Sequence, residues 1–459
     1  MSDQKTDGDL SAFVLSSDLM VGPSQGWAAG GENAAIEQQV DRFIPQQPAT
    51  LEGANLNENI VSVLIIKFLY VRGINQGRAI AAQIKLPFNI VERVLFGLKS
   101  QLMVTYQGVG VGGDYRYELT PKGVEQARNY MEHCTYFGAA PVSLSEYGSS
   151  VKKQSIKNVK PDLGKISAAL GDLVVSSEVI SQVGQATRSA KSMFLFGNPG
   201  NGKTSIARRL IRSIAESIWI PRTLAVGGEI MRLYDPSLHE ETPLPNSNNI
   251  FKEQDIDERW VRIKRPVVNV GGELALSHLG INLNPVTGIL ESPIHMKSNC
   301  GCLIIDDFGR QRISTVDLLN RWIVPLECGQ DHLNMPSGRQ LIVPFDQLIV
   351  FSTNLRPSEL CDEAFLRRIP YKVHIPDPTE RQFRELWQRQ TQAHHVICDS
   401  QWLDYLMEHH YLAQNRPMRF CHVDDLLSQI KEYSEFHGQQ AVVSEASLNA
   451  AVMNYFSAC

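Results

Sequence analysis

The pattern of apolar and polar residues divides the chain into five stretches of different character. Residues 1–53 are rich in Gly, Ser, Gln and Asp and show little periodicity, which predicts a flexible tail. From residue 54 onward, apolar residues recur at helical spacing. Helices are predicted for "NENIVSVLIIKFLYVRG", "GRAIAAQIKLP" and "FNIVERVLFGLKSQ", followed by a glycine-rich hairpin and a fourth helix, "TPKGVEQARNYMEH".

Three helices and a hairpin in this order resemble a winged-helix domain, which we place at residues 54–137. Winged-helix domains invite a DNA-binding interpretation, but residues 54–135 hold only nine Lys and Arg residues against six Asp and Glu residues. This excess is thin for a surface that must neutralise many phosphates. We therefore expect the domain to bind a protein or to regulate the enzyme; a nucleic-acid partner stays open but is not favoured.

The remainder of the chain changes character twice. Residues 138–161 carry Pro, Ser, Gly and Lys without periodicity, which indicates a flexible linker. Helical and strand-like segments alternate over residues 162–376, the pattern of an α/β domain. Residues 377–459 read as helical throughout. The sequence thus predicts a small helical domain at the C-terminal end of an α/β domain.

Composition narrows the class of protein further. The net charge of −5 and the pI of about 6.2 provide no global basic excess for nucleic acid. There is no apolar run of transmembrane length and no signal peptide, so we expect no membrane insertion. The eight cysteines are scattered without the spacing of a metal site or a disulfide framework. A reduced, cytoplasmic enzyme is the default expectation.

The segment "MFLFGNPGNGKTSIARRL" holds the decisive motif. A short apolar strand (193–196) and a helix (203 to about 217) flank a glycine-rich loop, which is the context that a phosphate-binding P-loop requires. Lys203 would reach the β- and γ-phosphates of ATP, and the Thr204 hydroxyl would bind Mg²⁺. The predicted nucleotide-binding residues are Gly197, Asn198, Pro199, Gly200, Asn201, Gly202, Lys203, Thr204 and Ser205.

Two adjacent carboxylates end a second apolar run, "GCLIIDDFGRQR". Ionised side chains at the end of a buried strand are costly unless a positive charge lies near them. Mg²⁺ is a hard cation that takes oxygen ligands, so we expect Asp306 to complete the metal site. For that purpose the strand that ends at Asp306 is expected to lie beside the P-loop strand.

Further motifs follow in an order that resembles AAA+ ATPases, over roughly residues 162–456. "QLIVFSTN" looks like the sensor-1 strand, "CDEAFLRRIPYKVHI" like the arginine-finger region and "NRPMRFCHVDDLLSQI" like sensor 2. The resemblance implies that Asp307 polarises the attacking water, a position where such ATPases usually carry the longer glutamate. It also implies sensor 1 at Asn354, a finger at Arg368 or alternatively Arg367, and sensor 2 at Arg419 or alternatively Arg416.

Two segments narrow the resemblance to AAA+ ATPases or depart from it. "DHLNMPSGRQLIVPFD" resembles the pre-sensor-1 β-hairpin of MoxR-like ATPases and MCM helicases, which projects toward a central pore; a plain surface hairpin is the alternative. About 100 residues separate Lys203 from Asp306, more than a strand, a helix and two loops need. Within them "RWVRIKRPVVNVGGEL" predicts a hairpin insertion of unassigned role.

The expected fold is therefore α/β: a P-loop NTPase core of the AAA+ type with a parallel sheet, a C-terminal helical lid and an N-terminal winged helix. The expected cofactors are ATP and Mg²⁺. An arginine finger that reaches the nucleotide of a neighbouring subunit implies a homo-oligomer, which we expect to be a hexameric ring. The resemblance also suggests that the protein is a chaperone-like remodeller of a protein client. Two alternatives stay open: a DNA-associated motor or transcription regulator, and a nucleotide-gated scaffold with little turnover.

Overall fold

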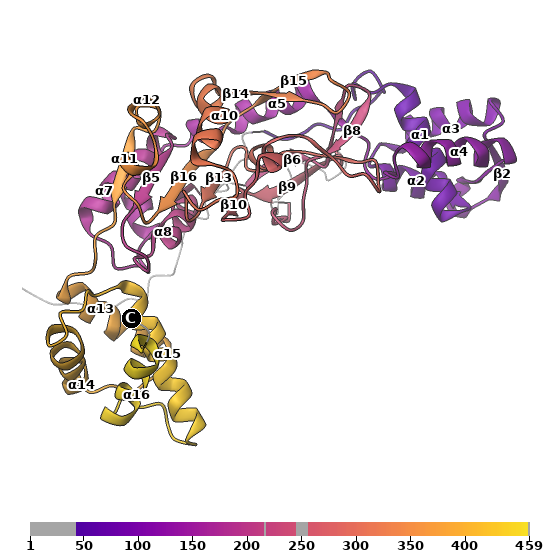
Figure 1. The fold of residues 1–459 in the computed structure, drawn as a ribbon. Helices are drawn as coiled ribbons and strands as arrows, with labels where there is room; N and C mark the ends of the chain where they lie inside the picture. The colour runs from indigo at the N-terminus through magenta and orange to yellow at the C-terminus, as the bar shows by residue number, and fades with distance from the viewer. Residues whose placement is uncertain (1–42, 215–216, 245–255, 458–459) are drawn as a thin grey trace, which may run out of the picture. The chain divides into compact units, whose positions relative to one another are not determined.

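The computed structural model describes residues 43–214, 217–244 and 256–457, all of which belong to one unit, Asp41–Cys459 (Figure 1). Most of the predicted tail, residues 1–42, lies outside the described residues. Residues 43–53 are packed against the rest of the chain: the Phe43 ring lies 5.1 Å from the Trp260 ring, and the Pro45 carbonyl accepts a hydrogen bond from Asp257 N. For these last residues the expectation of a free tail is wrong, because they supply an aromatic contact and a backbone acceptor.

The N-terminal region has the four predicted helices and the predicted hairpin, and a further short strand, β1, that was not predicted. Helix α1 begins after Asn57, whose side chain accepts from Asn59 N, and α4 begins after Thr120, with Pro121 as its first residue. The strands form an antiparallel sheet in the order β1-β3-β2. The elements are α1 Glu58–Arg72, β1 Asn75–Gln76, α2 Gly77–Ile84, α3 Phe88–Ser100, β2 Val104–Val109, β3 Tyr115–Leu119 and α4 Pro121–His133.

The segment 138–161, predicted to be a flexible linker, has regular structure and is packed. It contains β4 (Val142–Ser143) and α5 (Leu144–Gln154). Ser143 and Glu146 form a reciprocal capping box at the start of α5, and Tyr147 is 1% exposed. The expectation of a structureless linker is wrong here. Because the helix is short and has few apolar positions, its periodicity is weak, and its capping residues are the better indication of a helix.

The core is a five-stranded sheet in which every pair of neighbours is parallel. Its strands, in spatial order, are β10 Val267–Val270, β13 Cys302–Ile305, β16 Leu348–Thr353, β5 Met193–Phe196 and β17 Tyr371–His374. The expectation that the Asp306 strand adjoins the P-loop strand is wrong, since β16 lies between β13 and β5. All six residues of β16 are buried, which suits it to the centre of a sheet covered on both faces.

Helices cover both faces of this sheet, as Figure 1 shows. Met193 and Leu195 pack on one face with α6 (Leu163–Ala169), α7 (Ser177–Ser189) and α8 (Lys203–Leu210). Phe194 and Phe351 pack on the other face with α10 (Thr315–Cys328). The alternation of successive side chains between faces therefore explains why the strands read as continuous apolar runs. Helix α8 is shorter than predicted and passes into a 3₁₀ turn, Ile211–Ile214.

The insertion between α8 and β13 builds two small sheets. Strand β6 (Ser217–Pro221) pairs antiparallel with β9 (Trp260–Lys264). The predicted hairpin over 259–274 is wrong: β9 joins β6, whereas β10 joins the core sheet, and Pro266, which lacks an N–H, separates the two strands. The second sheet has the order β11-β12-β8-β7-β4, in which the new strands are β7 Thr223–Val226, β8 Glu229–Arg232, β11 Asn282–Leu283 and β12 Leu290–Glu291.

The predicted hairpin before the sensor-1 strand is confirmed as β14 (Gln330–Asn334) and β15 (Gln340–Pro344). One of its faces is buried in the core of the insertion through Leu333, Leu341 and Val343. Met335 at the tip contacts the turn between β7 and β8, where a Cβ atom on Gly227 would lie 3.1 Å from the Met335 sulfur. The hairpin thus packs against the insertion along one face.

The C-terminal region is helical, as predicted. It consists of α13 (Glu380–Ala393), α14 (Ser400–Tyr405) with a π-helical continuation (Leu406–Leu412), α15 (Phe420–Phe436) and α16 (Glu445–Phe456). These helices share a core of their own around buried aromatic and aliphatic side chains. Within the described part of the chain, no helix combines the length and the apolar character that crossing a bilayer requires.

Candidate active site

The loop after β5 has a backbone that only glycine adopts easily. Gly197 has φ +146°, and a Cβ atom there would lie 2.3 Å from the Ile375 carbonyl oxygen. Gly202 has φ +76° and caps the start of α8. These two glycines turn the chain tightly between the strand and the helix, so that the first backbone N–H groups of α8 face the open end of the loop.

Lys203 is the first residue of α8, and its side chain, which bonds to the carbonyl oxygens of the loop, is 7% exposed. Its ammonium group donates to the carbonyl oxygens of Gly197 (3.0 Å) and Asn198 (2.9 Å) and to Asn354 Oδ1 (2.7 Å). Burial lowers the pKa of Lys203, and the nearby carboxylates of Asp306 and Asp307 oppose that shift. The P-loop lysine and the predicted sensor-1 asparagine are therefore in direct contact.

Thr204 and Asp306 also meet, although 102 positions separate them in the chain. Thr204 Oγ1 donates to Asp306 Oδ2 at 2.8 Å, and Asp306 Oδ1 accepts from Asp307 N at 3.1 Å. The carboxyl ends of β5, β13 and β16 face the same edge of the sheet, which is how a parallel sheet collects polar side chains from distant segments. A hydroxyl and a carboxylate are oxygen donors of the kind that Mg²⁺ takes.

Asp307 follows Asp306 in a left-handed backbone conformation, with φ +49°. Gln311 stabilises this turn by donating to the carbonyl oxygens of both aspartates at 2.9 and 3.0 Å. Asp307 is exposed and lines the pocket described below. Helix α10 is capped by Ser314, which accepts from Asp317 N, so Asp307 is not needed as a helix cap.

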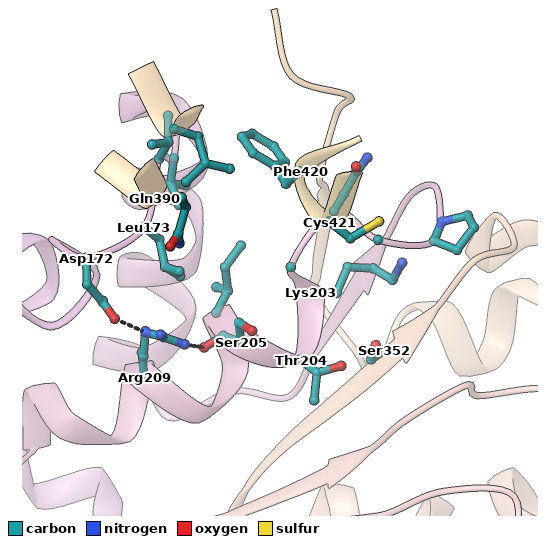
Figure 2. Close-up of a pocket in the computed structure, with 18 of the residues that line it drawn as sticks. Asp172, Leu173, Lys203, Thr204, Ser205, Arg209, Ser352, Gln390, Phe420 and Cys421 are labelled. Atoms are coloured by element: carbon teal, nitrogen blue, oxygen red, sulfur yellow. Dashed lines mark hydrogen bonds and ion pairs between the residues drawn. The ribbon is translucent and has the colours of Figure 1, made fainter. Parts of the chain in front are cut away.

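These side chains open into a cavity of about 710 Å³, a size that suits a small-molecule ligand (Figure 2). Arg209 on one wall pairs with Asp172 at 2.6 Å. Both the core and the C-terminal helices contribute to the walls. The lining residues include Leu173, Val175, Pro199–Ser205, Asp306, Asp307, Ser352, Asn354, Leu386, Gln390, Phe420 and Cys421.

The two arginines proposed for sensor 2 have different surroundings. Arg419 is the N-cap of α15 and forms an ion pair with Asp377. Arg416 stacks on the Phe456 ring, 3.7 Å from its centre, and donates to the His410 carbonyl. Arg419 is close enough to Lys203 to contribute to the lowering of its pKa. Of the two, Arg419 therefore pairs with the aspartate that holds the P-loop side chains, while Arg416 packs within the C-terminal helices. Neither arginine lines the pocket in the part of the chain that the structure describes.

The two finger candidates follow α12 (Glu363–Leu366), just before β17. Arg368 forms an ion pair with Glu327 of α10 at 2.7 Å and is 21% exposed. Arg367 is exposed. Neither residue lines the pocket of its own chain in the part that the structure describes, so the structure does not bring them together with Lys203 and Asp306.

Two polar residues of this region were not singled out from the sequence. Asp377 follows β17 and accepts hydrogen bonds from the side chains of Asn198 and Asn201 in the P-loop. Ser352 is 1% exposed, lines the pocket and has no hydrogen-bond partner for its hydroxyl among the described residues. Two signals were available in the sequence. Asp377 follows the end of a core strand, and Ser352 lies near the end of β16, two residues before Asn354.

Three comparisons place the chain among known proteins. A family described as "Domain of unknown function (DUF8689)" matches residues 379–454, the C-terminal helices. No curated protein matches the sequence. Among solved structures, the chain is similar to two point mutants of RuvB from Thermotoga maritima, at 13% and 11% identity with TM-scores of 0.35 and 0.34. The matches cover 61% and 66% of this chain and 70% and 73% of those chains.

A further similar structure is NtrX from Brucella abortus, at 10% identity and a TM-score of 0.38, which covers 80% of this chain and 62% of that chain. These TM-scores are low, so the fold assignment rests on the chain's own features. A parallel sheet, a glycine loop between β5 and α8, and Thr204 in contact with Asp306 are all present. The core has the P-loop NTPase fold. In a P-loop NTPase the loop and the first turn of its helix hold nucleotide phosphates.

Proposed function

We propose that this protein is an AAA+ ATPase that converts ATP and water to ADP and phosphate. The observation that carries the proposal is the convergence of Lys203, Thr204, Asp306 and Asn354 at one end of the parallel sheet, in one cavity. In this assignment Lys203 neutralises the β- and γ-phosphates, and the loop Gly197–Ser205 holds them through backbone N–H groups. Asp307 orients the attacking water, and Asn354 assists it.

The donor set at Thr204 and Asp306 fits Mg²⁺. Such a site needs few protein ligands because phosphate oxygens and water complete the coordination shell. In agreement, no group of three or more His, Cys, Asp or Glu side chains that could hold a metal on its own occurs within residues 43–214, 217–244 and 256–457. When bound, the ion would neutralise charge on the β- and γ-phosphates. Thr204 and Asp306 would position it, and Asp307 would remain available for water.

Steady-state ATP hydrolysis tests the proposal. We expect magnesium-dependent turnover in the wild-type protein and its loss in Lys203→Ala. Lys191→Ala is a suitable control, because it also removes a lysine close to β5 but at the opposite end of the strand from the loop. Nucleotide binding without turnover in the wild type would favour the scaffold alternative, which the short side chain of Asp307 motivates. The absence of nucleotide binding would refute the proposal.

We further propose that the ATPase works as a hexameric ring that remodels a protein client, with Arg368 or Arg367 reaching the nucleotide of the next subunit. The position of both arginines away from their own pocket supports an action in trans. Analytical ultracentrifugation with and without ATP tests the ring: a monomer under both conditions would contradict it.

We also propose that the protein works in a reducing compartment such as the cytoplasm. The seven described cysteines are unpaired, which supports this proposal.

For residues 54–137 we propose a winged helix that docks a protein. The order of elements supports this fold: one helix is followed by a strand, two helices, two strands and a final helix. A nucleic-acid role gains nothing from Tyr106, because Lys99 lies 3.6 Å from the centre of its ring and Tyr115 stacks on it, so both faces of the ring are covered. Salt-dependent binding to single-stranded or duplex DNA would establish that alternative, and no binding at low salt would exclude it.

A further inference from the structure

Asp377 connects three parts of the site. It lies just after β17, where the chain leaves the core for α13, and its side chain is 33% exposed. Asn198 Nδ2 donates to both of its oxygens at 3.0 Å, and Asn201 Nδ2 donates to Oδ1 at 2.7 Å. Arg419 forms an ion pair with the same Oδ1 atom. One carboxylate therefore holds two side chains of the P-loop and the arginine at the start of α15.

A second contact joins the same two elements. Cys421 N, in the first turn of α15, donates to the Gly200 carbonyl at 3.0 Å. Gly200 has φ +81°, and a Cβ atom there would lie 2.3 Å from the Cys421 sulfur. The tip of the P-loop thus packs directly against the N-terminus of α15. A change in the P-loop on ligand binding would reach Arg419 through this contact as well as through Asp377.

The charge of Arg419 acts on the phosphate-binding region. Its guanidinium is always protonated, and it is 17% exposed. Its partner Asp377 accepts from the side chain of Asn198, and the carbonyl oxygen of that asparagine accepts from Lys203 Nζ at 2.9 Å, so both cations are held at the same loop. Burial raises the pKa of Asp377, but hydrogen bonds from Asn201, Asn198 and Arg419 outweigh it and lower the pKa, so the carboxylate is ionised at neutral pH. Asp377 and a terminal phosphate are therefore alternative anionic partners for Arg419.

We propose that Asp377 is a positioning residue that sets how strongly the site distinguishes a nucleoside triphosphate from a diphosphate. Asp377 holds Asn198 and Asn201 in place and competes with the terminal phosphate for Arg419. A triphosphate must draw Arg419 away from Asp377, whereas a diphosphate leaves that ion pair intact. This inference rests on the proposed ATPase function and adds to it a residue that contacts neither the metal ligands nor the water-orienting aspartate.

Asp377→Asn tests the inference, because it removes the charge but keeps an oxygen that can accept from Asn201. Dissociation constants for ATP and ADP are measured by calorimetry without Mg²⁺, so that turnover does not interfere. Charged hydrogen bonds contribute enough for us to expect ATP binding about tenfold tighter in the variant, with ADP binding changed less than about twofold. Asp424→Asn, which removes an exposed carboxylate from α15, where it pairs with His394 and not with Arg419, is the control and is expected to change neither constant.

A double-mutant cycle with Arg419→Gln separates the proposed competition from a general structural effect. Arg419→Gln alone is expected to weaken ATP binding more than ADP binding, and in that background Asp377→Asn is expected to leave the ATP-to-ADP ratio unchanged. Asp377→Glu, which keeps the charge, is expected to keep the ratio near that of the wild type. This ratio is measured on folded protein, so partial misfolding of Asp377→Asn does not obscure it.

Three outcomes would overturn the inference. Asp377→Asn could change the affinities for ATP and ADP by the same factor, or its effect on their ratio could persist in the Arg419→Gln background. If Asp377→Asn fails to fold, equal weakening of ATP and ADP binding by Arg419→Gln overturns the inference instead. Wild-type protein that binds neither nucleotide would refute the ATPase proposal, and the role of Asp377 with it.

Discussion

At the scale of single residues, two functional side chains in this site, Lys203 and Asp306, have more than one partner. Lys203 donates to three oxygens, and Asp306 accepts from both Thr204 and the backbone of Asp307. A substitution therefore removes one partner from a group that keeps others, and graded effects on binding and turnover are expected rather than unfolding.

Thr204→Ala removes the hydroxyl that we assign to Mg²⁺. We expect the Mg²⁺ concentration for half-maximal hydrolysis to rise about tenfold, because one oxygen ligand and a charged hydrogen bond to Asp306 are lost. Thr204→Ser keeps the hydroxyl and should behave nearly as the wild type. The check is a magnesium titration of ATP hydrolysis, and identical curves for Thr204→Ala and the wild type would contradict the metal assignment.

His422 predicts a pH dependence of stability. Burial, with the charges of Arg419 and Arg416, lowers its pKa to about 4, while a histidine in an unfolded chain titrates near pH 6.5. As the pH falls from 6.5 to 4, the unfolded state binds a proton that the folded state does not. The free energy of unfolding therefore decreases over that interval by up to about 3 kcal/mol and is not lowered further by this group below pH 4.

Thermal unfolding at pH 7.5 and pH 4.5 measures this effect. The loss of stability on acidification should be smaller in His422→Gln, a variant that can still bond with the Tyr411 hydroxyl, which lies 2.9 Å from His422 Nδ1. An equal loss in the variant and the wild type would show that other groups account for the acid sensitivity.

At the scale of elements, α5 contributes more to the core than its composition suggests. Tyr147 is fully buried; its hydroxyl donates to the Met296 carbonyl at 3.3 Å and accepts from Asn299 at 2.8 Å. We expect Tyr147→Ala to lower the free energy of unfolding by about 3–5 kcal/mol through the cavity that it leaves. Tyr147→Phe removes only the hydroxyl, at a cost of about 1 kcal/mol.

Urea denaturation compares these two variants of Tyr147. If both variants were as stable as the wild type, the packing of α5 would contribute nothing to stability, and the prediction would be wrong.

The sequence identified those elements whose signal is local. The glycine loop, the strand before Asn354 and the C-terminal helices follow from motif and periodicity, and Lys203 contacts Asn354 while Thr204 contacts Asp306. Strand order did not follow, because the pairing of β16 with both β5 and β13 depends on burial across the sheet rather than on spacing along the chain. The role of Asp377 was not predicted either, because it depends on residues that are distant in the chain. Its partners lie about 180 and 40 residues away.

At the scale of the whole molecule, truncations test how the regions depend on one another. Deletion of residues 1–140 keeps β4 and α5, and we expect ATP hydrolysis to persist, although Arg259 loses the Ala54 carbonyl as an acceptor. Deletion of residues 1–161 removes α5 together with Ser155, whose hydroxyl donates to Asp346 at 2.8 Å. We expect this longer deletion to abolish nucleotide binding, as measured by calorimetry on soluble protein.

The same binding and turnover by both truncations would contradict this prediction. Loss of nucleotide binding in the shorter truncation would instead show that the N-terminal region is needed for the core to fold.

The arginine pair tests assembly. We expect Arg368→Ala to leave ATP affinity within about threefold of the wild type but to slow hydrolysis by about a thousandfold, the scale of an arginine finger. Arg367→Ala is the matched variant and should retain most activity.

ATP turnover and nucleotide affinity, measured side by side, decide between the two arginines. Normal turnover in Arg368→Ala combined with loss in Arg367→Ala would assign the finger to the exposed neighbour.

The packing of Met335 against Gly227 has an evolutionary consequence. The two residues belong to hairpins that are far apart in the chain, and a Cβ atom at position 227 would lie 3.1 Å from the Met335 sulfur, so the methionine side chain would have to shift. Gly227 also has φ +59°, which favours glycine, so a relative with a larger residue at position 227 should carry a different turn as well as a smaller residue at position 335. These two hairpin tips are therefore expected to covary, and an engineered exchange at one of them would need a compensating exchange at the other.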